Sequence, residues 1–211
     1  ATLTPRYEQW RHSLLARNIP TPNLMTPLTT TSASFLRTDT HWTPTGAEAV
    51  ATALYTYALN EGLWQAPEPS YVTTQQDSRE YEGDLLVFLP LGIARSLGPA
   101  PATLTLYQTQ SGEASSLGLF DDYTVDITLV GSCFSANPAW HFEVWREQAF
   151  QTDVGNVAAE GQGPLQPMLD YLTSSTFTEN PPQLVIWEIP ERYLPVQDPS
   201  GHASINPSGC P

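Results

Sequence analysis

The chain has 211 residues, of which 40% are apolar, and this length is enough to bury one sizeable hydrophobic core. Its formal net charge is −14, because it has 22 acidic side chains and only 8 basic ones, all of them arginines. Binding to a phosphate backbone requires clustered positive charge, so nucleic acid and anionic membrane surfaces are poor candidate partners. No apolar run approaches the roughly 20 residues that span a bilayer, and we expect a protein that does not cross the membrane.

The first part of the chain predicts two helices with a short strand between them. Apolar residues recur at helical spacing over residues 7–17, a proline-bearing segment ends that helix, and a strand is expected near residues 23–25. Thr43 is suited to cap a second helix that starts at Pro44. This helix begins directly behind His41, so we expect the imidazole in a loop beside a rigid element.

The second part of the chain alternates strands with helices. Residues 82–89 suit a helix or a loop, and residues 102–107 alternate like an exposed edge strand. Strands are then expected at residues 122–130, 154–159 and 183–187, and helices at residues 139–150 and 165–172. This order predicts an α/β fold with a mainly parallel sheet that is covered on both faces. We expect one domain over residues 1–195, followed by a loosely ordered tail over residues 196–211.

Two segments about ninety residues apart carry the groups that acyl transfer needs. Asp39 and His41 are two residues apart, so the carboxylate can hold one imidazole nitrogen while the other faces a nucleophile. The sequence Gly-Ser-Cys-Phe-Ser at 131–135 follows an apolar strand and offers that nucleophile. Ligands of parallel sheets bind at the carboxyl ends of the strands. We therefore expect residues 131–135, 160–163 and 187–192 to converge there with Asp39 and His41.

The chain has two cysteines, Cys133 and Cys210, and Cys210 lies in the proline- and serine-containing tail. The two could pair in an oxidising compartment, but nothing in their spacing requires it, and we expect them to remain unpaired. The sequence therefore does not fix the redox compartment, although twenty prolines and few charges are typical of a loop-rich exported protein. No cluster of histidine, cysteine and acidic residues has the spacing of a metal site, so no metal is expected.

Five motifs occur together in a characteristic order. They are Asp-x-His-Trp at 39–42, Gly83-Asp-Leu-Leu-x-Phe-Leu-Pro90, Gly131-x-x-Phe-Ser-Ala-Asn-Pro138, Asn156-x-Ala-Ala-Glu-Gly-x-Gly-Pro164 and Trp187-Glu-Ile-Pro-Glu-Arg-Tyr193. In these motifs, which span roughly residues 7 to 195, the chain resembles the alginate and exopolysaccharide O-acetyltransferases of the AlgX/AlgJ type. The resemblance implies an SGNH-hydrolase-like three-layer sandwich in which the Asp/His segment precedes the nucleophile, a circular permutation of the usual order. It also implies that a further strand precedes Ala1.

The same resemblance implies a periplasmic or exported enzyme. Such an enzyme moves acetyl groups onto hydroxyls of a secreted polysaccharide through a covalent acetyl-enzyme, without a cofactor. The acetyl group would come from a donor, and a membrane-bound acetyl-transfer partner is one source that the resemblance suggests. The alternatives are a polysaccharide acetylesterase, in which water accepts the acetyl group, and a non-catalytic polysaccharide-binding or scaffold protein of the same fold.

The catalytic roles follow from the matching positions. Asp39 would fix the tautomer of His41, and His41 would act as general base. The family's nucleophilic serine falls at Cys133, and three interpretations remain open at this point. Cys133 is a working nucleophile, Ser132 or Ser135 serves instead, or the chain is a non-catalytic descendant in which Cys133 is a small core residue.

The remaining candidates would bind the oxyanion or the substrate. The backbone N–H groups of Gly161 and Cys133 are expected to form the oxyanion hole. The asparagine usual in SGNH enzymes has no match here, so either Arg192 or a backbone group substitutes for it, or the hole is weaker. Trp42, Arg192 and Tyr193 are candidates to line a sugar groove, because aromatic faces and planar donors suit carbohydrate and carboxylate groups. The alternative for these three residues is packing, with an ion pair from the arginine to a nearby glutamate.

Overall fold

The computed structural model describes residues 4–89, 92–111, 125–194, 196–197 and 203–204. The elements in these residues are α1 (Thr4–Leu15), α2 (Met25–Thr30), α3 (Pro44–Asn60), β1 (Tyr71–Tyr81), η1 (Asp84–Phe88), η2 (Gly92–Leu97), β2 (Ala102–Ser111), β3 (Ile127–Val130), α4 (Cys133–Ala136), η3 (Pro138–Trp140), α5 (Phe142–Phe150), β4 (Val154–Asn156), α6 (Leu165–Thr173), α7 (Ser175–Glu179), β5 (Leu184–Trp187), η4 (Glu191–Tyr193), β6 (Val196–Gln197) and β7 (Ala203–Ser204). Among the described helices, none combines the length and the apolar character that a membrane crossing needs.

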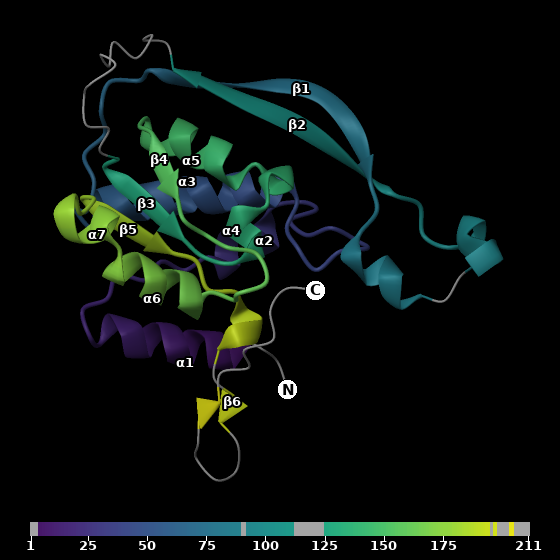
Figure 1. Cartoon of the computed structure of the whole chain (residues 1–211), viewed down its shortest axis with the longest axis horizontal. Helices are drawn as coiled ribbons and strands as arrows, with labels where there is room; N and C mark the ends of the chain where they lie inside the picture. The colour runs from purple at the N-terminus through teal and green to yellow at the C-terminus, as the bar shows by residue number, and fades with distance from the viewer. Residues whose placement is uncertain (1–3, 90–91, 112–124, 195, 198–202, 205–211) are drawn as a thin grey trace.

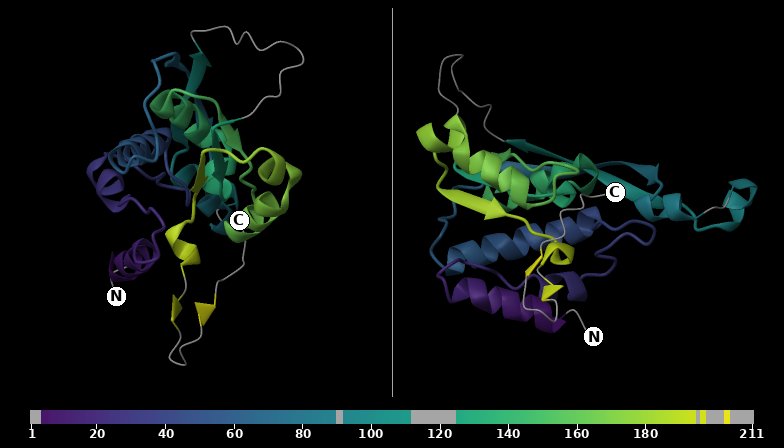
Figure 2. Two further views of the ribbon diagram at one scale, coloured as in Figure 1. Left: turned by 90° about the vertical axis from the view of Figure 1, so that its left-hand side faces the viewer. Right: turned by 60° about the horizontal axis from the view of Figure 1, so that its bottom comes forward.

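A parallel sheet in the order β4-β3-β5 lies at the centre of the domain, as the alternation of strands and helices predicts. Side chains of β3 alternate between two hydrophobic clusters. Ile127 and Leu129 join the larger cluster, which includes residues of α3 and α5, whereas Val130 packs with Met168 and Tyr171 of α6. Both faces of β3 are therefore covered. Figure 2 shows α6 and α7 on one side of this sheet and α2 and α3 on the other.

Helix α3 begins where the sequence predicts it. The Thr43 hydroxyl accepts the N–H of Gly46 at 3.0 Å, and Pro44 occupies the first turn, where a missing N–H costs nothing. Gly46 allows the loop before the helix to approach closely, because a Cβ on this residue would lie 2.2 Å from the carbonyl oxygen of Ser34. The start of α3 is therefore fixed, and the loop that carries His41 is fixed with it.

A long antiparallel hairpin of β1 and β2 crosses the domain and extends beyond it toward η1 and η2 (Figure 1). The strand in β2 was predicted, but β1 was not, because its mostly polar sequence is exposed on both faces and shows no alternation. The strands pair from Tyr71 opposite Ser111 to Tyr81 opposite Ala102, with an irregularity between Gln75 and Ser78. Tyr81, at the end of β1 that leads into η1, donates a hydrogen bond to Asp39, so this end of the hairpin lies beside the loop that carries His41.

Some local predictions were wrong. Residues 23–25 do not form a strand, since the Asn23 side chain accepts the N–H of Met25 and α2 begins there. The helix expected from residue 139 begins at Phe142, because His141 adopts a left-handed backbone conformation after a short 3-10 turn. The short helix α7, which Ser174 caps, was not predicted.

Two predictions fall partly outside the described residues. The start of the strand expected over residues 122–130 lies there, and the described strand begins at Ile127. Most of the expected tail also lies there, and only the pairing of β6 with β7 is described within it. The division into a domain and a tail remains a prediction.

Candidate active site

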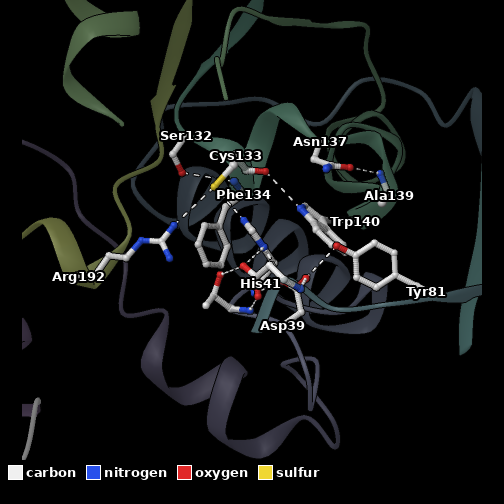
Figure 3. A network of polar contacts seen from close by, with 12 residues as sticks. Asp39, His41, Tyr81, Ser132, Cys133, Phe134, Asn137, Ala139, Trp140 and Arg192 are labelled. Carbon is white, nitrogen blue, oxygen red and sulfur yellow. Dashed lines mark hydrogen bonds and ion pairs between the residues drawn. The ribbon is translucent and has the colours of Figure 1, made fainter. Parts of the chain in front are cut away.

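Close polar contacts run from Asp39 through His41 to Cys133 (Figure 3). The Asp39 Oδ1 atom lies 2.6 Å from His41 Nδ1, and His41 Nε2 lies 2.8 Å from the sulfur of Cys133. A carboxylate behind an imidazole favours the tautomer with its proton on Nδ1, which leaves Nε2 to take a proton from a nucleophile. The two segments predicted to cooperate therefore meet at the carboxyl end of β3.

Asp39 is held from three directions. Its Oδ1 atom accepts the N–H of His41 at 2.8 Å, and its Oδ2 atom accepts the Tyr81 hydroxyl at 2.8 Å and the N–H of Asp84 at 2.9 Å. Burial works to raise the pKa of Asp39, but these hydrogen bonds and the one to the His41 ring lower it to about 2. Asp39 is therefore a carboxylate over the whole working pH range. Conversely, burial and the contact with Asp39 raise the pKa of Tyr81.

The Gly83-Asp84 motif packs against the loop that carries Asp39 and His41. The Asp84 carboxylate accepts the Thr40 N–H at 2.9 Å and the Thr40 hydroxyl at 2.6 Å. A Cβ on Gly83 would lie 1.9 Å from the Thr38 carbonyl oxygen, so only glycine permits this approach. The sequence contained this motif without indicating what it does. Tyr81 was missed altogether, because a tyrosine at the end of a polar strand carries no signal of its partner.

The imidazole ring of His41 lies between two aromatic rings. Trp140 stacks on it at a centroid distance of 4.9 Å and an angle of 18°, and Phe134 lies at 4.7 Å in a tilted arrangement. The indole N–H of Trp140 also donates to the carbonyl oxygen of Cys133 at 3.2 Å. These contacts fix the plane of the base and keep water away from its sides.

Cys133 is the first residue of α4, in the turn directly after β3. The Ser132 hydroxyl caps this helix by accepting the N–H of Phe134 at 3.4 Å. On the other side, Nη2 of Arg192 lies 3.6 Å from the sulfur of Cys133, while the guanidinium lies over the Phe134 ring at 5.3 Å. A fixed cation beside a cysteine favours the thiolate form, which is the nucleophilic one.

Cys133 takes part in a disulfide bond, which corrects the expectation that the cysteines remain unpaired. The sequence holds one other cysteine, Cys210, which lies outside the described residues. A sulfur in a disulfide has no proton to release and does not act as a nucleophile. The distances around Cys133 therefore belong to an oxidised site, and acyl chemistry at this atom requires the reduced thiol.

The two neighbouring serines point elsewhere. The Ser132 hydroxyl donates to the Glu188 carboxylate at 2.9 Å, and the Ser135 hydroxyl donates to the same carboxylate at 3.1 Å. Both serines are buried. Among the described hydrogen-bond partners, His41 Nε2 contacts only the sulfur of Cys133. The arrangement thus favours Cys133 over Ser132 and Ser135 as the partner of the base.

The other predicted residues fall into two groups. Arg192 is exposed and lies 3.6 Å from the Cys133 sulfur, whereas Trp42 and Tyr193 are each only 5% exposed. The Trp42 ring packs on Phe134 at 5.3 Å, which favours the packing role left open for it. Gly161 has a positive φ of 74° and faces open space, and no contact within the described residues links it to Cys133. Its role in the oxyanion hole remains a prediction.

Asp39, His41 and Asp84 lie close enough together to be considered as metal ligands. Their ligand atoms are already engaged, however, because the Asp39 carboxylate holds His41 Nδ1 and the Asp84 carboxylate accepts two donors from Thr40. The donor set therefore fits a base that is oriented by a carboxylate better than it fits a metal centre.

Comparison with known proteins places this site in a family. Residues 1–191 match the family model described as SGNH hydrolase-like domain, acetyltransferase AlgX. The chain belongs to this AlgX family. It is 41% identical over 200 residues to the probable alginate O-acetylase AlgJ of Pseudomonas putida, a match that covers 91% of this chain and 52% of the relative. It is 32% identical over 167 residues to the alginate biosynthesis protein AlgX of Pseudomonas aeruginosa, covering 76% of this chain and 34% of AlgX.

The solved structures agree with this membership. The O-acetyltransferase domain of Pseudomonas putida AlgJ superposes with a TM-score of 0.79 at 39% identity, covering 93% of this chain and 68% of that one. Pseudomonas aeruginosa AlgX superposes with a TM-score of 0.66 at 23% identity, covering 87% of this chain and 42% of that one, and shares the fold. The SGNH-hydrolase-like fold expected from the resemblance is confirmed. The chain spans about half the length of the curated AlgJ relatives that it matches.

Proposed function

We propose that this AlgX-family protein is an O-acetyltransferase that moves acetyl groups onto hydroxyls of a secreted polysaccharide through an acetyl-enzyme on Cys133. The observation that carries the proposal is the continuous contact of Asp39, His41 and Cys133, with distances of 2.6 and 2.8 Å. The printed names of its AlgJ relatives, probable alginate O-acetylases, support an alginate-like acceptor. We further infer a periplasmic or exported location, a three-layer sandwich and a circularly permuted motif order.

In the first half-reaction, His41 Nε2 takes the thiol proton of reduced Cys133 and the thiolate attacks the carbonyl carbon of the acetyl donor. The tetrahedral intermediate collapses as the bond to the donor's alcohol breaks, and the His41 imidazolium returns its proton to that leaving group. The product is a thioester on Cys133. Asp39, ionised throughout, stabilises the imidazolium that forms between the two steps.

In the second half-reaction, a sugar hydroxyl enters the space vacated by the donor's alcohol. His41 takes the hydroxyl proton, the oxygen attacks the thioester carbonyl, and the Cys133 thiolate leaves and recovers the proton from His41. The net result is the exchange of an ester from one alcohol to another, with atoms and charge balanced. In an acetylesterase, water would take the place of the sugar hydroxyl in this step.

Each tetrahedral intermediate carries an oxyanion that needs hydrogen-bond donors to stabilise it. The guanidinium of Arg192, 3.6 Å from the Cys133 sulfur, is the described side chain best placed to supply one. The side chain of Asn156 is committed elsewhere, because its amide donates to the Ser135 carbonyl at 3.0 Å and to Glu143 at 3.1 Å. We propose that Arg192 and the N–H of Cys133 share this role with Gly161.

The test is an acetyl-transfer assay under reducing conditions. Reduced protein is incubated with p-nitrophenyl acetate and mannuronate oligosaccharides, and the oligosaccharides are analysed by mass spectrometry for a gain of one acetyl group. Acetylated oligosaccharide in the wild type, absent in Cys133→Ala, is the expected result. Release of acetate without acetylated sugar would indicate an esterase toward this acceptor. Turnover of neither kind, together with measurable oligosaccharide binding, would indicate a scaffold and contradict the enzyme.

A further inference from the structure

The carboxylate of Glu188 lies at the centre of the nucleophile loop, although it comes more than fifty residues later in the chain. It accepts three hydrogen bonds from this loop, from the Ser132 N–H at 2.8 Å, the Ser132 hydroxyl at 2.9 Å and the Ser135 hydroxyl at 3.1 Å. These donors lie on either side of Cys133. A carboxylate offers two acceptor oxygens with several lone pairs, so it satisfies three converging donors better than any neutral side chain.

The contact also explains the glycine that begins this loop. A Cβ on Gly131 would lie 2.6 Å from Glu188 Oε2 and 2.9 Å from the Glu188 Cβ. The φ of Gly131 lies outside the left-handed region, so its backbone alone does not demand glycine. Glycine is required here because the Glu188 side chain fills the space that a Cβ would occupy.

The backbone of Glu188 places this carboxylate accurately. Its N–H donates to the Val130 carbonyl at 2.8 Å, which continues the pairing of β5 with β3 by one residue past the strand. Glu188 is thus fixed to the same strand that carries the nucleophile. Burial raises the pKa of Glu188, whereas the hydrogen bonds from the loop and the nearby Arg192 act in the opposite direction. The pKa of Glu188 stays raised, so burying this carboxylate under the loop costs solvation free energy that the loop contacts offset only in part.

We propose that Glu188 is a positioning residue for acyl transfer, which holds residues 131–135 so that the Cys133 sulfur faces His41. The inference rests on the proposed function, because it concerns the rate at which Cys133 is acetylated. A displacement of a reacting atom by about 1 Å can cost roughly a hundredfold in rate, so the loss of three hydrogen bonds from this loop should be visible in the chemical step. Binding of the donor or the polymer should be affected little.

The test compares Glu188→Ala and Glu188→Gln with the wild type, all in a Cys210→Ser background so that one thiol is followed. The rate constant of Cys133 acetylation by p-nitrophenyl acetate is measured by stopped-flow and normalised to the titrated Cys133 thiol. We expect a loss of roughly a hundredfold for Glu188→Ala and a smaller loss, roughly tenfold, for Glu188→Gln, which keeps one acceptor oxygen. The ester concentration at half-maximal rate should stay within about twofold of wild type.

A matched control is Glu191→Gln in the same segment, since the Glu191 carboxylate lies 4.0 Å from Arg6 rather than under the loop. This variant should acetylate at the wild-type rate. Normalisation to titrated thiol separates positioning from folding, because a variant that is merely less stable loses active protein and keeps its rate per thiol. A rate for Glu188→Gln within twofold of wild type, in folded protein, would overturn the inference. Absence of acetylation in the wild type would instead contradict the proposed function.

A double-mutant cycle gives an independent check. Ser132→Ala removes one of the hydroxyl donors to Glu188, and if the two side chains act as one unit, the combined loss will be smaller than the product of the two single losses. Independent, multiplicative losses would contradict a positioning role through this contact. Gly131→Ala should lower the acetylation rate as Glu188→Ala does, because the added Cβ displaces the Glu188 carboxylate from the loop.

Discussion

The loop that carries Asp39 and His41 and the loop that carries Cys133 meet in one site, but they are held by different parts of the chain. The first is held by the local hydrogen bond between Asp39 and His41, by the Gly83-Asp84 motif and by Tyr81 at the end of β1. The second is held by residues that follow β5, chiefly Glu188. The Asp39–His41 pair can therefore be recognised in a short stretch of sequence, whereas the support of Cys133 depends on strand topology.

The largest expected effect tests the first loop. Asp39→Asn keeps the size of the side chain but removes the charge that holds the proton on Nδ1 of His41. We expect the rate constant of Cys133 acetylation to fall by roughly 10³ to 10⁴, as expected when the imidazole adopts the wrong tautomer. Stopped-flow kinetics on reduced, folded protein provide the measurement. A loss below tenfold would mean that the carboxylate does not orient the base.

The next largest effect concerns the redox state of Cys133 in the second loop. Because Cys133 takes part in a disulfide, the wild type without reductant should show less than roughly a tenth of its activity with reductant. Cys210→Ser, which removes the only other cysteine of the sequence, should be active without reductant. Ester hydrolysis or transfer, with and without dithiothreitol, provides the comparison. Equal activity of the wild type in both conditions would exclude Cys133 as the nucleophile.

A third prediction concerns acid stability. The pKa of Asp39 is lowered from 3.8 to about 2 in the folded protein. The ionised carboxylate therefore stabilises the folded state fully at pH values above 3.8, and this stabilisation is lost as the pH falls toward the pKa of the folded protein. The difference corresponds to about 2 kcal/mol of unfolding free energy. Denaturant unfolding at pH 5 and pH 2 should show Asp39→Asn losing less stability than the wild type. Parallel losses would mean that the hydrogen bonds to Asp39 do not stabilise its charge.

The smallest effect should come from Tyr81, which contributes one of several hydrogen bonds to Asp39. Tyr81→Phe should lower the acetylation rate by roughly three- to tenfold with little change in the ester concentration at half-maximal rate. Tyr107→Phe is a suitable control, because Tyr107 packs against Trp145 and His141 away from the carboxylate. Equal losses in both variants would point to a general effect of hairpin packing.

Local signals in the sequence predicted local structure well. The Thr43 cap, the helix behind it and the buried strand before Gly131 all follow from short patterns, and all were found. Strand β1 was not predicted, because its polar residues are kept in place by pairing with β2 and by α5, which no local pattern reveals. The strand expected near residues 23–25 failed for a different reason, since the Asn23 side chain accepts the N–H of Met25 and α2 begins at Met25.

In the site, too, the residues that follow from local patterns were predicted and those that depend on tertiary contacts were not. Asp39 and His41 could be paired from their spacing, and Cys133 from its place after a strand. The supporting residues could not, because Tyr81, Trp140 and Glu188 act through contacts that only the folded chain creates. The sequence offered Trp42 as a residue that could line a sugar groove, yet the structure buries it in the core. An aromatic residue next to His41 suits both roles, so the sequence alone did not separate them.

The most direct test of the central claim is to locate the acetyl group. Reduced protein in the Cys210→Ser background is mixed with p-nitrophenyl acetate, quenched in acid and analysed by peptide mass spectrometry. The proposed chemistry predicts an added acetyl group on Cys133, formed at least a hundredfold more slowly in His41→Ala. An acetyl group on Ser132 or Ser135, or one on Cys133 that forms equally fast without His41, would contradict it.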